Sequence, residues 1–149
     1  MNEQIFFEYL QGKWLIERKI VDKSSRLHSA SAFGKVDIIK TSKNILNYQE
    51  LLKVKWGNNF SSNSHKQYDY VLDNSGCLGL YNYDDKRSFM FNLIFDPNLN
   101  NVIKGQYQCI QDSYLATYKI INYKQFILIF QVNGPKKDCS IISSFVKGS

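Results

Sequence analysis

The segment FFEYLQGKWLIERKI, Phe6–Ile20, changes its hydrophobic period at Gly12. Before this glycine, the apolar residues recur at the spacings of one helix face: Ile5, Phe6, Tyr9 and Leu10. Asn2 is a residue type that caps helix N-termini. After Gly12 the period becomes two, and one strand face carries Trp14, Ile16, Arg18 and Ile20. The segment therefore predicts a short helix over residues 2–11 and a strand that begins at residue 13.

The rest of the chain contains further segments with the composition and alternation of strands, separated by polar turn sequences. They are 29–38, 45–54, 66–72, 78–83, 88–95, 102–109, 114–121, 125–132 and 140–146. No helical pattern stands between them, and both prolines, Pro97 and Pro135, lie in expected turns. Short strands joined by tight turns favour an antiparallel meander over a parallel sheet.

A meander of about ten strands tends to close on itself, because closure pairs the edges that would otherwise stay exposed. The predicted fold class is all-β, an antiparallel β-barrel of about eight to ten strands over residues 13–147 with the helix at one mouth. A two-sheet sandwich is the alternative. With 149 residues, the chain has the length of one domain, and we expect residues 1–149 to form a single domain.

The charge of the chain indicates no specific nucleic-acid partner. The formal net charge is +6, but the 19 basic residues are spread among 13 acidic ones. The densest basic pairs, Lys86–Arg87 and Lys136–Lys137, each adjoin an aspartate. This pattern is typical of a solvated surface.

The N-terminal residues and the spacing of the cysteines indicate where the protein is located and whether its thiols are reduced. No apolar run approaches the roughly 18 residues of a membrane span, and Glu3 and Glu8 stand where a secretion signal would be basic. Cys77, Cys109 and Cys139 are an odd number without Cys-x-x-Cys spacing, which favours reduced thiols over disulfides or a metal site. We expect a cytoplasmic protein with no metal and no cofactor.

The face predicted to point into the barrel is aromatic, with phenol groups among the apolar side chains. Two ionisable residues, Arg18 and Glu50, share that face. Because a buried charge needs a partner, we expect them to meet each other or tyrosine hydroxyls. They are then either the polar anchors of a ligand pocket or a closed network that holds the strand register.

Motifs for catalysis are few. His28 and His65 lie in or beside polar loop stretches, and Cys109 has no histidine nearby in the sequence. A glycine-rich phosphate loop is not found. The residues best suited to chemistry, with Glu50 as a general acid or base, are Arg18, Tyr48, Glu50 and Tyr114.

The start Gly12-Lys13-Trp14, after a short helix, resembles the Gly-x-Trp signature of lipocalins and the wider calycin group. In those proteins the tryptophan closes the base of the barrel, and a basic residue of the last strand packs over it. The corresponding residue here is Lys147, where an arginine is more usual. Lysine lacks the planar guanidinium that stacks well on indole.

Nearly the whole chain also resembles an uncharacterised domain family of about this length, found in bacteria and fungi. The matched residues are Gly12, Trp14, Arg18, Tyr48, Glu50, Tyr68, Tyr70, Arg87, Phe89, Cys109, Asp112, Tyr114, Gly134, Pro135 and Lys137. Tyr107 stands where that family has a histidine. The resemblance implies a barrel fold and no established activity.

A more distant resemblance is to the bilin chromophore lyases of the calycin group, which share the helix, the Gly-Lys-Trp start and the antiparallel barrel. Such proteins hold an open-chain tetrapyrrole and deliver it to a cysteine of another protein. An arginine or a carboxylate engages the bilin, and the resemblance gives these parts to Arg18 and Glu50.

Three functions follow as hypotheses. The first is a barrel that binds a small, largely apolar or amphipathic molecule with an anionic or carbonyl end. Its candidate ligand-binding residues are Arg18, Tyr48, Glu50, Tyr68, Tyr70, Phe89, Tyr107 and Tyr114. The second is a lyase or isomerase on the same barrel. The third is a barrel filled by its own side chains, which engages a protein partner through its basic surface and the turn 56–59.

Overall fold

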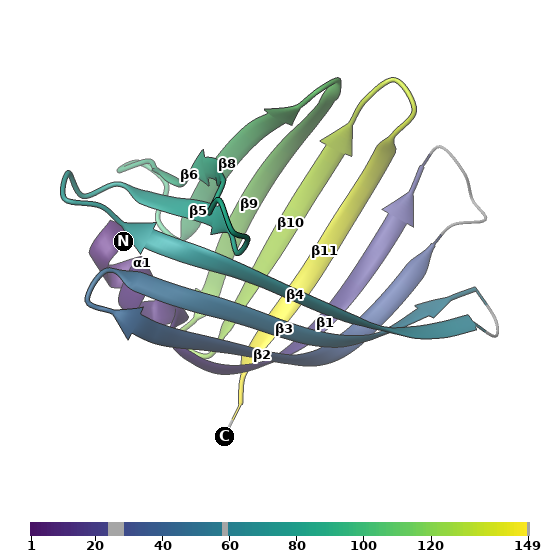
Figure 1. Ribbon diagram of the computed structural model, residues 1–149, viewed down its shortest axis with the longest axis horizontal. Coiled ribbons are helices and arrows are strands. Elements are labelled where there is room, and N and C mark those ends of the chain that lie inside the picture. The colour runs from purple at the N-terminus through teal and green to yellow at the C-terminus, as the bar shows by residue number, and fades with distance from the viewer. Residues whose placement is uncertain (24–28, 58–59, 149) are drawn as a thin grey trace.

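The computed structural model describes residues 1–23, 29–57 and 60–148. These residues form one helix and one antiparallel sheet that curls into a barrel (Figure 1). The elements are α1 (Glu3–Leu10), β1 (Gly12–Asp22), β2 (Ala30–Ser42), β3 (Ile45–Trp56), β4 (Phe60–Leu72), β5 (Leu78–Asn82), β6 (Phe89–Asn92), β7 (Ile94–Phe95), β8 (Val102–Cys109), β9 (Asp112–Asn122), β10 (Gln125–Asn133) and β11 (Asp138–Lys147).

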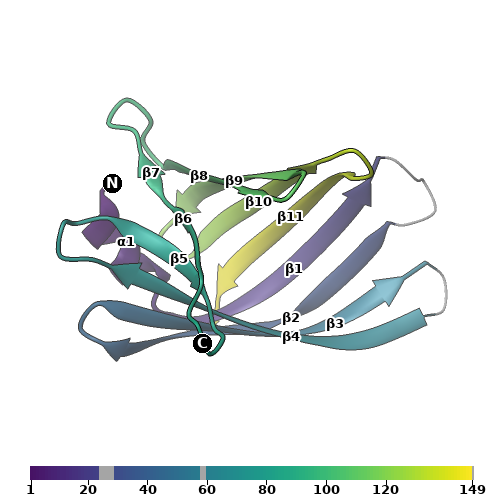
Figure 2. The same ribbon diagram turned by 45° about the horizontal axis from the view of Figure 1, so that its top comes forward.

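The order of strands in the sheet is β6-β5-β4-β3-β2-β1-β11-β10-β9-β8-β7. The ladder between β1 and β11 joins the first strand to the last. At the other end of this order, β6 and β7 are separated in the chain by Leu93 alone, so the two sheet edges come together and the barrel is nearly closed. Figure 2 shows the strands curving around one interior, with α1 at one end. The predicted all-β barrel with an N-terminal helix is confirmed.

The helix α1 closes one end of the barrel. Asn2 Oδ1 accepts a hydrogen bond from the Ile5 N–H at 2.9 Å, so the predicted N-cap is confirmed. The side chains of Phe6, Phe7 and Leu10 are fully buried. The Phe6 ring meets Tyr118 edge-to-face, with 5.4 Å between the ring centroids. Helix burial rather than intrinsic propensity stabilises so short a helix.

Trp14 and Lys147 form the clasp expected from the calycin resemblance. Trp14 is buried, and its Nε1 donates to the Leu10 carbonyl oxygen at 2.8 Å. Lys147 Nζ lies 4.3 Å from the centroid of the indole and donates to the Gln11 carbonyl oxygen. The last strand is thereby tied to the link between α1 and β1 by a cation–π contact and a hydrogen bond.

The inward register is confirmed along most strands, but it was wrong for Phe89. The ladder between β5 and β6 pairs Tyr81 with Phe89 and Leu80 with Phe91, which leaves Met90 as an extra residue. Because of this extra residue, the side chains before and after the bulge do not alternate between the two faces of the sheet as they would in a regular strand. Phe89 is 54% exposed and packs edge-to-face on Tyr81, whereas Met90 is half-buried.

Several boundaries differ from the sequence prediction. The segment expected as one strand over 88–95 is divided into β6 and β7. β4 begins at Phe60, so His65 lies within a strand rather than beside a loop. Its side chain is exposed. His28 and residues 58–59 of the turn 56–59 lie outside the described residues. No helix in the described part of the chain is long and apolar enough to cross a membrane.

Candidate functional site

The interior of the barrel contains a cavity of about 160 Å³. Its walls come from both halves of the sheet, and tyrosine is the commonest residue type among them. The lining residues are Arg18, Tyr48, Glu50, Lys66, Tyr68, Tyr70, Leu80, Met90, Tyr107, Tyr114, Tyr118, Leu128, Phe130 and Ile141. The cavity therefore combines aromatic walls with a few polar groups, as small-molecule sites do.

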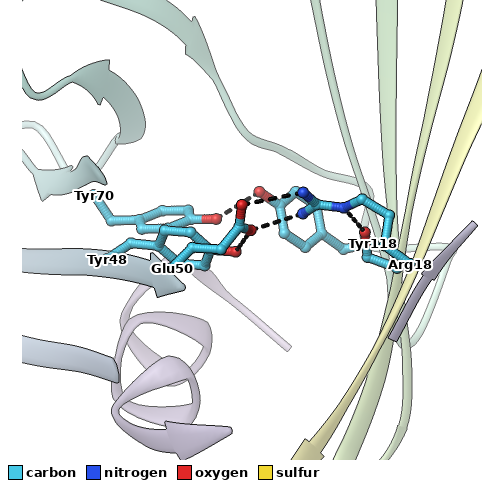
Figure 3. A network of polar contacts seen from close by, with 6 residues as sticks. Arg18, Tyr48, Glu50, Tyr70 and Tyr118 are labelled. Atoms are coloured by element: carbon cyan, nitrogen blue, oxygen red, sulfur yellow. Dashed lines mark hydrogen bonds and ion pairs between the residues drawn. The ribbon is translucent and has the colours of Figure 1, made fainter. Parts of the chain in front are cut away.

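The polar centre of the cavity is an ion pair between Arg18 and Glu50 (Figure 3). Arg18 Nη2 donates to Glu50 Oε1 at 2.7 Å, and Nη1 donates to Oε2 at 3.1 Å. Arg18 Nε donates to Ser143 Oγ at 2.8 Å, and the Tyr48 hydroxyl donates to Glu50 Oε1 at 2.6 Å. The Glu50 side chain is 1% exposed and that of Arg18 is 15% exposed. Two parallel N–H···O bonds between ions are among the strongest polar contacts in proteins.

This network changes the proton affinity of its members. Burial alone would lower the pKa of Arg18, but the hydrogen bond and the negative charge of Glu50 together raise it. Burial raises the pKa of Tyr48 well above its usual value, and the charge of Glu50 raises it further. The guanidinium stays charged and the phenol stays protonated, so Tyr48 acts as a hydrogen-bond donor to the carboxylate.

Tyr70 and Tyr118 form a second polar pair in the lining, from β4 and β9. Their hydroxyl oxygens are 2.7 Å apart, and both side chains are buried. Burial raises the pKa of both phenols above the usual range. Their mutual hydrogen bond satisfies two groups that would otherwise be costly to bury.

Two of the lining residues, Tyr107 and Tyr114, belong to a stack of aromatic rings. The rings of Tyr107 and Tyr114 are stacked, with centroids 4.5 Å apart and planes at 9°. Phe91 stacks on Tyr107 at 5.4 Å, also at 9°. Both tyrosines are half-buried, and burial raises the pKa of Tyr107 to about 12. Parallel rings from β6, β8 and β9 therefore cover the line where the sheet edges come together.

Lys66 is the third charged residue of the cavity. It lies opposite Glu50 in the ladder between β3 and β4, and its side chain is exposed. Both oxygens of Glu50 are already engaged by Arg18 and Tyr48. Across the described residues, Lys66 makes no ion pair.

The structure brings together seven of the eight candidate ligand-binding residues. Those that line the cavity are Arg18, Tyr48, Glu50, Tyr68, Tyr70, Tyr107 and Tyr114. Phe89 faces away from it because of the bulge in β6. That these residues bind a ligand stays a prediction.

The candidate residues left out three polar members of the site, Lys66, Tyr118 and Ser143. Lys66 shares the alternation of Tyr68 and Tyr70, so the register contained a signal for it, although its strand was expected to start there. The alternation of the last strand puts Ser143 on the same face as Ile141 and Phe145, but nothing in that strand indicates the bond to Arg18. Met90 enters the lining only through the bulge in β6.

Comparison with solved structures supports the fold. The S-type phycobiliprotein lyase CPES from Guillardia theta has a TM-score of 0.74 and 10% sequence identity, covering 100% of this chain and 94% of that chain. At this identity the likeness concerns the fold alone.

Two designed barrels are less similar. The redesigned β-barrel mFAP0, bound to DFHBI, has a TM-score of 0.42 and 8% identity, covering 93% of this chain and 99% of its own. A fluorescence-activating β-barrel of de novo design has a TM-score of 0.40 and 10% identity, covering 95% of each chain. Likeness at this level supports no conclusion about function.

Sequence comparison gives the family. No curated protein matches the sequence. Residues 10–147 match DUF6314, described as a family of unknown function. The match spans the whole barrel from the end of α1 to the end of β11. The chain therefore belongs to the DUF6314 family.

Proposed function

We propose that this protein binds a small, largely apolar or amphipathic molecule inside the barrel. The observation that carries the proposal is the tyrosine-lined cavity with the Arg18–Glu50 pair in its wall. Most of the ligand would lie against aromatic side chains, and the few polar groups would orient it. The candidate residues that line the cavity would provide these contacts.

The size of the cavity sets a scale for the ligand. Its volume of about 160 Å³ is close to that of an engineered protein cavity of ~150 Å³ that binds benzene. Lys66 lines the cavity and is exposed, so the cavity reaches the surface beside it. A ligand larger than one aromatic ring would extend outward through this mouth.

Two other functions have less support. A filled barrel acting only on protein partners would have no need of the interior space. A lyase or isomerase would need a reactive group, but both oxygens of Glu50 are held by Arg18 and Tyr48.

The cytoplasmic location is part of the proposal, and it is supported by the free, exposed thiols of Cys77 and Cys109, which suit a reducing compartment.

Native mass spectrometry of the freshly purified protein tests the proposal, followed by solvent extraction of any bound compound. We expect a stoichiometric adduct. The variant Ile141→Trp places an indole in the lining and should abolish the adduct. Its control is Ile142→Trp, the next residue on β11, which points outward and is 39% exposed. An adduct that survives Ile141→Trp would contradict binding in the cavity.

A further inference from the structure

We propose that the cavity selects an aromatic monoanion, and that Lys66 rather than Arg18 recognises the acidic group. This inference rests on the proposed function, because it concerns the ligand of the same cavity. It specifies that the ligand is aromatic, that it carries one negative charge, and that Lys66 binds the charged group.

The charge of Arg18 is already balanced by Glu50, although two of its five N–H groups stay free of the contacts below. Its Nη1 and Nη2 donate to the two oxygens of Glu50, and its Nε donates to Ser143. The carboxylate compensates the guanidinium charge at short range in a buried setting. A ligand anion at the remaining N–H groups of Arg18 would lie beside the carboxylate of Glu50 and be repelled by it, and displacing Glu50 would leave that carboxylate buried without a cation.

Lys66 is placed differently. It comes from the neighbouring strand, opposite Glu50, and no carboxylate in the described chain pairs with it. Among the lining residues, the formal charges of Arg18 and Glu50 cancel, and Lys66 leaves one positive charge. A single acidic group on the ligand would neutralise the cavity, and an ammonium binds carboxylates, sulfonates and phosphates alike.

The remaining polar groups of the lining are phenols. The hydroxyls of Tyr68, Tyr107 and Tyr114 make no hydrogen bond to other described residues. Burial raises the pKa of Tyr68 and that of Tyr107, so near neutral pH both phenols are uncharged donors that would add to an anion site. Their rings, with Phe130, favour a flat aromatic body that contacts aromatic faces and edges.

The test uses two single-ring probes with the same aromatic skeleton, because the cavity has room for one ring. Benzenesulfonate carries one negative charge, and benzenesulfonamide carries none at neutral pH. Isothermal titration calorimetry measures the dissociation constant of each. The variants are Lys66→Gln, which removes the charge, Lys66→Arg, which keeps it, and Lys53→Gln as the control, because Lys53 is exposed on the outer face of β3.

We expect Lys66→Gln to raise the dissociation constant of the sulfonate about fivefold, the scale of one exposed charge pair. The dissociation constant of the uncharged probe should stay the same. Lys66→Arg and Lys53→Gln should bind both probes like the wild type. Added salt should weaken only the sulfonate.

Two results would overturn the inference, and they differ in what they say about the proposed function. If Ile141→Trp weakens both probes while Lys66→Gln changes neither, the cavity binds ligands but Lys66 does not read their charge. If neither probe responds to Ile141→Trp, aromatic anions do not enter the cavity and the inference fails, whereas the proposed function fails only if the adduct seen by native mass spectrometry also survives Ile141→Trp.

Discussion

Arg18 and Glu50 meet inside the barrel although β2 lies between their strands. The guanidinium of Arg18, on β1, reaches the carboxylate of Glu50, on β3, with donor–acceptor distances of 2.7 and 3.1 Å. Ala32 stands opposite Arg18 on the intervening strand, and its small side chain lets the arginine pass. The pair thus ties together two strands that share no backbone hydrogen bonds.

Replacing Glu50 by alanine should destabilise the protein strongly. The change leaves Arg18 mostly buried without its anion and leaves the Tyr48 hydroxyl without its acceptor. We expect the free energy of unfolding to fall by about 3 kcal/mol, the low end for a broken buried pair, since Arg18 is partly exposed. Urea denaturation measures it.

The matched variant replaces both ions, as Arg18→Met with Glu50→Leu. Because no charge then remains buried, it should recover most of the lost stability. The single variants of this cycle are Arg18→Met and Glu50→Leu. If the loss of the double variant equals the sum of their two losses, the ions are not coupled.

Tyr118→Phe should lower the free energy of unfolding by about 1–2 kcal/mol, because it leaves the buried Tyr70 hydroxyl unpaired. Adding Tyr70→Phe should cost little more, since the second hydroxyl then no longer needs a partner. Chemical denaturation of the singles and the double forms a mutant cycle. Tyr123→Phe is the control, because Tyr123 is 75% exposed. Additive losses at Tyr70 and Tyr118 would argue against their hydrogen bond.

Gly105→Ala should destabilise the closure of the barrel. A Cβ at this position on β8 would overlap the ring of Phe91 from β6. Overpacking of this kind costs about 1–3 kcal/mol. Thermal unfolding measures the loss, and adding Phe91→Leu should restore part of it by making room for the methyl group. If Gly105→Ala has the wild-type melting temperature, Phe91 does not fill the space between β6 and β8.

The protein should lose stability as the pH rises above about 10, the usual pKa of tyrosine. Burial raises the folded-state pKa of Tyr48, Tyr70 and Tyr118, so their stabilising contribution is complete below that pH and is lost above it. The measurement is the absorbance of tyrosinate, followed as the pH is raised until the protein unfolds. The phenols of Tyr48, Tyr70 and Tyr118 should ionise only as the barrel unfolds. Ionisation of these three phenols with the fold intact would contradict the prediction.

Local sequence patterns were enough to predict the helix, the strands and most inward-facing residues. A strand has two faces, so a period of two in residues such as Tyr48, Glu50 and Leu52 is visible without any knowledge of the neighbouring strands. The same pattern indicated that Arg18 and Glu50 share the interior, where a charge without a partner is costly. Both are now seen to be paired.

The choice between a pocket and a closed network was not available from the sequence, because both give the same alternation. The structure contains the network and, beside it, a cavity. Whether side chains fill a barrel depends on the sum of their volumes across strands that are distant in the chain, which no single strand reveals.

By itself, the sequence determined the fold class, the N-terminal cap and the inward placement of Arg18 and Glu50, because each depends on a residue type at a regular position. The resemblance to calycins implied the Trp14–Lys147 clasp, and the structure decided that Arg18 and Glu50 pair with each other. Tertiary structure alone decided that Met90 rather than Phe89 lines the cavity, that Ser143 binds Arg18, and that Lys66 makes no ion pair within the described residues. These outcomes depend on register between strands and on competition for the two oxygens of Glu50. Both are settled only when the strands are placed side by side.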